Sequence, residues 1–116
     1  MCVLGTVLLA CAPKNLDKAE KKFKDAEYTV VKMAIPEALK KAGVDGYLEV
    51  RKDDEYLEAI HFASLDQARA YRKDQEEALK EMQNQYAAAF GSGVRYERVS
   101  SWIVLGTEEA TKLFKK

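Results

Sequence analysis

The chain has 116 residues and a mass of 13.1 kDa, which suffices for one small domain and not for two. Its 19 basic and 19 acidic residues cancel, so the composition offers no basic surface for nucleic acid. A single histidine and two cysteines, both near the N-terminus, exclude a disulfide scaffold and a His/Cys zinc cluster.

An apolar run over residues 3–10 ends at Cys11. It is too short for a membrane-spanning helix, which needs about 20 residues, but it matches the hydrophobic region of a secretory signal peptide. Leu8-Leu9-Ala10-Cys11 has the form of a lipobox, in which a small residue precedes the cysteine whose thiol is lipidated. We therefore expect a lipoprotein signal segment over 1–11 and a single domain over 12–116. Because no Lys or Arg precedes the run, a first strand remains the alternative.

The domain is predicted to open with a helix, a strand and a short helix. Asn15 can cap a helix whose apolar residues recur at spacings of three and four as far as Ala26. Residues 28–35 are rich in β-branched side chains and predict a strand. Pro36 fits the first turn of a short helix that runs through Lys41.

Residues 47–52 and 56–63 predict a hairpin. The length of its loop decides which side chains share a face, because side chains alternate along a strand. An even loop would place Glu49 opposite Glu58, and like charges in that position are destabilising. We expect an odd loop, because it collects the large apolar side chains on one face by aligning Leu48 and Val50 with Ile60 and Phe62.

A long helix is predicted after this hairpin. Ser64 and Gln67 have the spacing of a capping box, so the helix should begin at Leu65. An apolar stripe continues to Phe90, but polar side chains fill its middle. A continuous helix would be about 39 Å long, which exceeds the width of a domain of this size. The helix therefore either overhangs the sheet or breaks within 73–77.

Residues 94–99 and 102–106 predict a second hairpin, after which Thr107 can cap a last helix. Residues 62–71 match 105–114 in character, although any strand-to-helix junction uses a similar hydroxyl cap and acidic first turn. With or without a true repeat, the expected fold class is α+β. We expect an antiparallel sheet of about five strands with helices on one face, in the order α-β-(ββα)-(ββα).

One face of this sheet is expected to be unusually apolar. If Ile60, Phe62, Ile103 and Leu105 point toward the helices, their neighbours point outward, and a monomer rarely leaves such a patch in water. Tyrosines, the N-terminal segment or an additional helix could cover the patch, or it could bind a partner protein or a second copy. This candidate interaction face consists of Leu57, Ala59, His61, Trp102 and Val104.

Few residues suit catalysis. His61 lies in a strand with no serine or cysteine nucleophile in a recognisable motif, so we expect a structural histidine. Asp53-Asp54-Glu55 lacks the spacing of a calcium-binding loop. Gly91-Ser92-Gly93 follows a helix and cannot present a helix N-terminus to phosphate. The sequence therefore predicts no catalytic residue, no metal, no cofactor and no nucleic-acid partner.

Several segments in order, covering most of the chain, support a family resemblance: Cys11, the helix 15–26, Tyr28-Thr29-Val30, Gly46-Tyr47-Leu48, Ala59-Ile60-His61-Phe62 and the run 102–110. Together they resemble small lipoproteins of Gram-positive bacteria whose function is uncharacterised. The resemblance implies export and a lipid anchor at the outer face of the cytoplasmic membrane. It implies no particular activity and no catalytic residue.

Three functional hypotheses follow. The first is an exported domain, anchored to the membrane by a lipid on Cys11, that binds a partner or ligand and catalyses nothing. The second is a cytoplasmic homodimer that associates through the apolar sheet face, with residues 3–10 as its first strand. The third is an enzyme, which would require an active His61.

Overall fold

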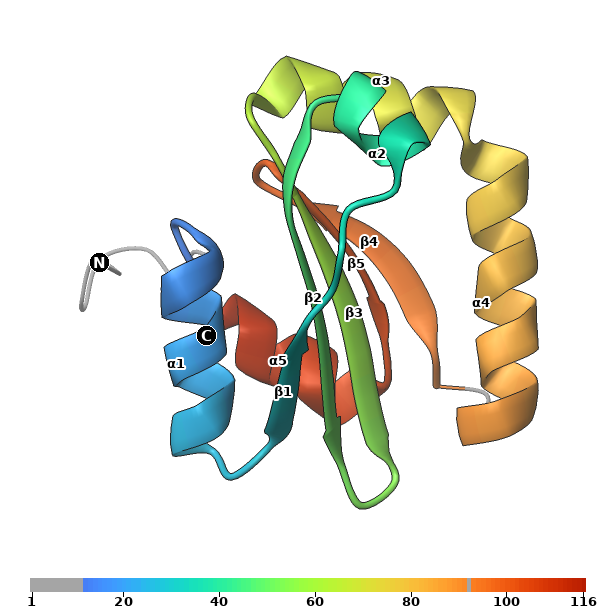
Figure 1. Cartoon of the computed structure of the whole chain (residues 1–116). Helices are drawn as coiled ribbons and strands as arrows, with labels where there is room; N and C mark the ends of the chain where they lie inside the picture. The colour runs from blue at the N-terminus through green and yellow to red at the C-terminus, as the bar shows by residue number, and fades with distance from the viewer. Residues whose placement is uncertain (1–11, 92) are drawn as a thin grey trace, which may run out of the picture.

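An antiparallel sheet of five strands, in the order β1-β2-β3-β5-β4, forms the centre of the molecule (Figure 1). The computed structural model describes residues 12–91 and 93–116. The α+β fold class and the five-stranded sheet are confirmed. The elements in chain order are α1 (Leu16–Asp25), β1 (Thr29–Lys32), α2 (Glu37–Lys41), β2 (Val44–Lys52), β3 (Glu55–Phe62), α3 (Leu65–Asp74), α4 (Glu76–Phe90), β4 (Arg95–Val99), β5 (Trp102–Gly106) and α5 (Glu108–Lys115).

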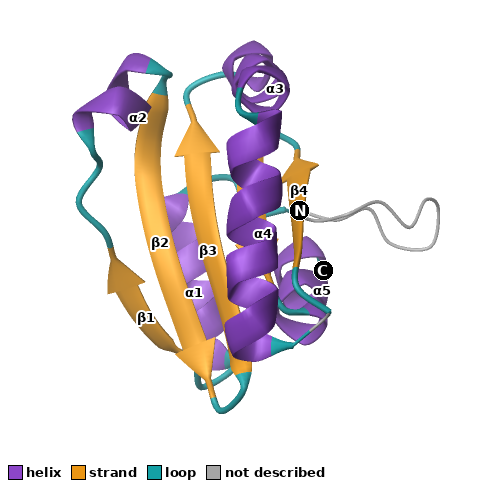
Figure 2. Cartoon of the chain, turned by 90° about the vertical axis from the view of Figure 1, so that its right-hand side faces the viewer, coloured by secondary structure: helices purple, strands orange, loops and turns teal. Residues whose placement is uncertain are grey.

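The helices cover both faces of the sheet, so the expectation of helices on one face is wrong. Phe23 of α1 and Phe114 of α5 pack in a core on one face. Ala68 of α3 and Leu79 of α4 belong to a second core on the other face. The two views show α4 and α1 on opposite sides of the strands (Figures 1 and 2). The physical reason is that every residue of β5 is buried, so both of its faces need a cover.

The first hairpin has a two-residue loop and the register that the sequence disfavoured. Lys52 pairs with Glu55, and Glu49 lies directly opposite Glu58. The loop residue Asp53 has φ of 54°, a left-handed conformation that aspartate tolerates better than most residues. The expected odd loop is therefore wrong, and the apolar residues Leu48 and Val50 belong to the core under α1 and α5.

The long helical segment is broken, which is one of the two outcomes that its length left open. The helix α3 ends at Asp74 and α4 begins at Glu76, with Gln75 between them at φ of −108°. In Figure 1, α3 lies across one end of the sheet and α4 runs along the strands. The predicted cap at Ser64 is confirmed, because its side chain accepts a hydrogen bond from the N–H of Gln67. Asn15 caps α1 in the same way.

Thr107 does not cap α5 with its side chain, which corrects the prediction. Its hydroxyl oxygen instead accepts from the N–H of Tyr56, at 3.1 Å, and donates to Glu55 Oε1, at 2.6 Å. The same junction holds Gly106 so close to β3 that a Cβ atom would lie 2.5 Å from the carbonyl oxygen of Tyr56. The start of α5 is therefore fastened to the start of β3. Because α3 and α5 lie on opposite faces, the two similar segments do not form a structural repeat.

Candidate functional site

The candidate interaction face predicted from the sequence lies inside the domain. Leu57, Ala59, Trp102 and Val104 are fully buried in the core that α1 and α5 cover. The indole N–H of Trp102 donates to the carbonyl oxygen of Pro13 at 2.7 Å. The expectation that this face is a free surface for a partner is therefore wrong, because the predicted helices α1 and α5 cover it. The predicted lipidation site, Cys11, lies outside the described residues.

The opposite face of the sheet holds a cavity of about 190 Å³ beneath α3 and α4. The side chains around it come from every layer of this half of the molecule: α2, β2, β3, α3, α4 and β5. They are Leu39, Tyr47, Glu58, Ile60, Tyr71, Leu79, Met82, Ile103 and Leu105. Among these described residues, Glu58 carries the one charge. The cavity therefore has an apolar body and a single acidic point.

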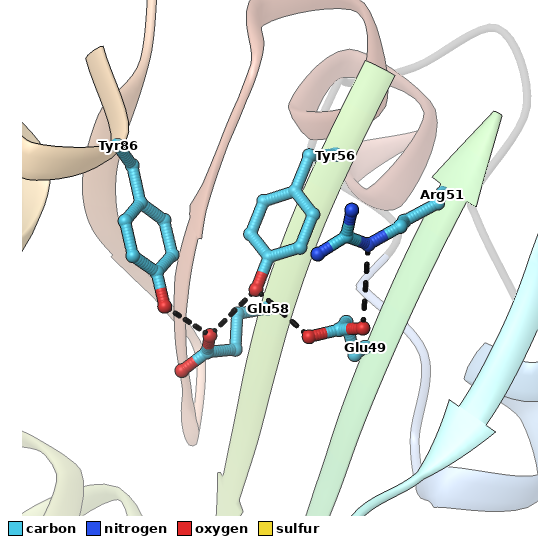
Figure 3. Close-up of polar contacts among 5 residues, drawn as sticks. All are labelled: Glu49, Arg51, Tyr56, Glu58 and Tyr86. Carbon is cyan, nitrogen blue, oxygen red and sulfur yellow. Dashed lines mark hydrogen bonds and ion pairs between the residues drawn. The ribbon is translucent and has the colours of Figure 1, made fainter. Parts of the chain in front are cut away.

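Three tyrosine hydroxyls hold the carboxylate of Glu58. Tyr47 donates to Oε1 at 2.7 Å. Tyr56 and Tyr86 both donate to Oε2, at 2.7 and 2.9 Å. Figure 3 shows the two phenols on Oε2, which reach it from β3 and from α4. A carboxylate has about four lone-pair positions, so Oε1 retains one acceptor position for another donor.

The same tyrosines explain how the strands tolerate two facing glutamates. The hydroxyl of Tyr56 lies between the two side chains, 2.7 Å from Glu58 and 3.1 Å from Glu49. Arg51 lies beside Glu49, with Nε 3.4 Å from Oε1 (Figure 3). These donors and the guanidinium charge offset the like-charge repulsion. Sequence reasoning missed this arrangement because Tyr86 is 28 residues from Glu58 and lies on another element.

The phenols around Glu58 are hydrogen-bond donors at physiological pH. Burial raises the pKa of Tyr47 and Tyr56 well above the ordinary value of 10.0, and their hydrogen bonds to Glu58 raise it further. Burial also raises the pKa of Tyr86 and of Tyr71. None of these hydroxyls is therefore activated as a nucleophile or a base. Their physical effect is to fix Glu58 at the edge of the cavity.

Aromatic rings attach the last turn of α4 to the sheet. The ring of Phe90 stacks on that of Tyr56 with centroids 4.7 Å apart and planes 7° apart. Tyr86 meets Tyr56 edge-on at 5.3 Å. The guanidinium of Arg51 lies over the ring of Tyr56 at 5.0 Å. These contacts hold the helix that closes one side of the cavity.

His61 is paired on both ring nitrogens, with partners that the sequence did not reveal. Its Nδ1 lies 2.6 Å from Asp45 Oδ1, and its Nε2 lies 3.2 Å from Ser101 Oγ. The ring also meets Trp102 edge-on at 4.6 Å. Ser101 is 40 residues from His61 in the chain, and no local motif marks it. Over residues 12–91 and 93–116, no group of three or more His, Cys, Asp or Glu residues is placed to hold a metal.

Comparison with protein-family models, curated proteins and solved structures found no match. In the part of the chain that the structure describes, no helix combines the length and the apolar character needed to cross a membrane. Function therefore has to be inferred from the two arrangements above, the cavity at Glu58 and the pairs made by His61.

Proposed function

We propose that this domain binds a small molecule with an apolar body and one basic group in the cavity at Glu58. The observation that carries the proposal is an apolar cavity whose described lining has one charged side chain, held in place by three phenols. A carboxylate fixed in this way costs no reordering when a ligand binds, and preorganisation of this kind increases affinity.

The volume of the cavity limits the ligand to a small one. An engineered apolar cavity of about 150 Å³ holds benzene, and drug-sized ligands need about 300 Å³ or more. A cavity of about 190 Å³ therefore fits a single substituted ring or a short alkyl chain. Met82 and Tyr71, which line it, are only partly buried, so such a molecule can enter from solvent.

The charge around Glu58 favours a cation as the polar end of this ligand. Among the described residues, Glu49 forms an ion pair with Arg51, whereas Glu58 forms no ion pair. Its hydrogen-bond partners are phenols, which carry no charge. A ligand ammonium group at the remaining position of Oε1 would supply a charge-assisted hydrogen bond, which is stronger than a neutral one.

The proposal can be tested by titrating the protein with 2-phenylethylamine while recording NMR chemical shifts. We expect shifts at the cavity residues and binding at least about tenfold weaker for the neutral analogue 2-phenylethanol, because it cannot form a charge-assisted bond. The variant Glu58→Gln should bind the amine at least about tenfold more weakly than the wild type does. Glu81→Gln is the matched control, because this exposed glutamate of α4 does not line the cavity, and the variant should bind as the wild type does.

Equal binding of the amine and the alcohol would contradict the proposed ligand class. Shifts confined to residues outside the cavity would contradict the proposed site.

We also propose that the domain is exported and anchored through a lipid on Cys11. The lipobox-like residues 8–11 and the resemblance to small lipoproteins support this location. Ala12 packs against the core and Pro13 is bonded to Trp102, which supports a domain that begins directly after Cys11. Mass spectrometry of the native protein should find a lipidated Cys11 as the first residue. An intact, unmodified N-terminus at Met1 in the cytoplasmic fraction would contradict it.

A further inference from the structure

Three side chains from separate parts of the chain meet at one end of the sheet. Asp45 lies on β2, at an irregularity where the pairing with β3 shifts between Val44 and Gly46. His61 lies near the end of β3, and Ser101 lies in the turn between β4 and β5. The N–H of Phe62 donates to the carbonyl oxygen of Ser101 at 2.8 Å, which docks this turn beside His61.

The contacts of His61 determine which ring nitrogen carries the hydrogen in the neutral form. The carboxylate of Asp45 can only accept a hydrogen bond, so the hydrogen of the neutral ring lies on Nδ1, 2.6 Å from Oδ1. Nε2 then presents its lone pair to the hydroxyl of Ser101, 3.2 Å away. The edge-on contact with Trp102 holds the ring in this orientation. A serine, a histidine nitrogen and a carboxylate in this order are the parts of an activated nucleophile.

We propose that Ser101 is a nucleophile toward small carboxylic esters, with His61 as its general base and Asp45 as a positioning residue. Ser101 is partly exposed and the side chain of His61 is 16% exposed, so a small ester can reach the hydroxyl. This activity is separate from binding at Glu58, and it departs from the sequence-based expectation of no catalysis.

The reaction requires no co-reactant other than water. Ser101 Oγ forms a bond to the ester carbonyl carbon while its hydrogen passes to His61 Nε2. The C–O bond to the leaving group then breaks, and the alcohol departs with that hydrogen. Water attacks the acyl-serine in the same way, giving its hydrogen to Nε2 and then to Oγ, and the carboxylic acid is released. The guanidinium of Arg98 donates to the carbonyl oxygen of Ser100 at 2.8 Å and so fixes the residue that precedes the nucleophile.

The test uses the full chain with two probes, a fluorophosphonate and p-nitrophenyl acetate. The fluorophosphonate forms an Oγ–P bond and releases fluoride, so peptide mapping shows which serine has reacted. We expect the label on Ser101 of the folded protein, with none on its neighbour Ser100. Ser101→Ala should remove both the label and the release of p-nitrophenol above background.

The carboxylate is tested by a variant that keeps the fold. The side chain of Asp45 is 55% exposed, so Asp45→Asn should leave thermal unfolding unchanged while slowing both reactions at least about tenfold. Asp54→Asn, at the exposed tip of the first hairpin, is the matched control and should react as the wild type does.

Any of three results would overturn the proposal. The first is equal labelling of Ser100 and Ser101, and the second is equal labelling of the protein unfolded in urea. The third is an unchanged rate in Asp45→Asn, which would show that the three residues form a structural hydrogen-bond network only.

Discussion

At the scale of single residues, the phenols around Glu58 couple stability to alkaline pH. Their pKa is raised by burial above the ordinary value of 10.0, with the hydrogen bonds to Glu58 acting in the same direction for Tyr47 and Tyr56. Above that pH the unfolded chain loses the phenol hydrogens that the folded protein keeps. The folded state then binds more protons than the unfolded state, so the free energy of unfolding falls as pH rises. Below pH 10.0 these phenols do not make the free energy of unfolding depend on pH.

Replacing one phenol should remove part of this pH dependence. We expect Tyr56→Phe to unfold about 1–2 kcal/mol more easily at neutral pH, because a hydrogen bond to a carboxylate is lost. Above pH 10.0 the variant should lose less additional stability than the wild type, because phenylalanine has no proton to release. Urea unfolding of both proteins over a pH series measures the two effects. Identical alkaline slopes would show that Tyr56 does not carry the coupling.

Side-chain contacts were predictable only where the two partners are close in sequence, and the contacts of the two candidate sites are not. The caps at Asn15 and Ser64 follow from a spacing of three residues, and the structure confirms both. Asp45 lies 16 residues and Ser101 lies 40 residues from His61. The pairing of the strands brings Asp45, His61 and Ser101 together. Their proximity cannot be read from the sequence unless the register of the strands is known.

At the scale of elements, α4 packs on the sheet near both of its ends, and between them Gln83 accepts from the N–H of Tyr96 while Tyr86 donates to Glu58. Leu79 is the one residue of α4 that is buried, and Phe90 stacks on Tyr56 near the other end of the helix. The remaining side chains of the helix are partly buried or exposed. This arrangement leaves the helix above the cavity with limited burial, so its C-terminal turns should open more readily than the core elements.

Removal of the contact between Phe90 and Tyr56 should loosen this helix selectively. We expect Phe90→Ala to cost about 1–2 kcal/mol, because an aromatic pair and part of its burial are lost. Amide exchange should accelerate over 76–90 and remain unchanged in α5, which packs on the opposite face. Equal acceleration in both helices would indicate general destabilisation and contradict a local attachment.

The elements themselves could be predicted better than their pairing. The length of a continuous helix compared with the width of the domain left an overhang or a break as alternatives, and the structure shows the break between α3 and α4. The register of β2 and β3 did not follow, because facing glutamates are costly unless donors from other elements reach them. One of those donors, Tyr86, belongs to α4, whose position over the sheet cannot be inferred from the hairpin sequence.

At the scale of the whole molecule, β3 and β5 contribute to both apolar cores. Leu57 and Trp102 belong to the core under α1 and α5, whereas Phe62 and Ile103 belong to the other. The uninterrupted apolar run in β5 is typical of a strand that is buried on both faces. It could not show that α1 covers part of one face, because an amphipathic helix does not specify which sheet face it meets.

Because the two cores share strands, we expect the domain to unfold in a single transition. Trp102 fluorescence reports the core under α1 and α5, and far-ultraviolet circular dichroism reports all helices, including α3 and α4. The midpoints of urea unfolding by the two signals should coincide. Separate midpoints would show that one core can survive the loss of the other.

The hydrogen bond between Trp102 and Pro13 has a consequence for orientation. Two residues of extended chain span at most about 7 Å, so a lipid carried by Cys11 would leave almost no tether between the bilayer and the bonded Pro13. The cavity at Glu58 lies on the opposite face of the sheet from the core that contains Trp102. An anchored molecule would therefore sit close against its membrane with the mouth of the cavity turned to the surrounding medium, where water-soluble amines could reach it directly.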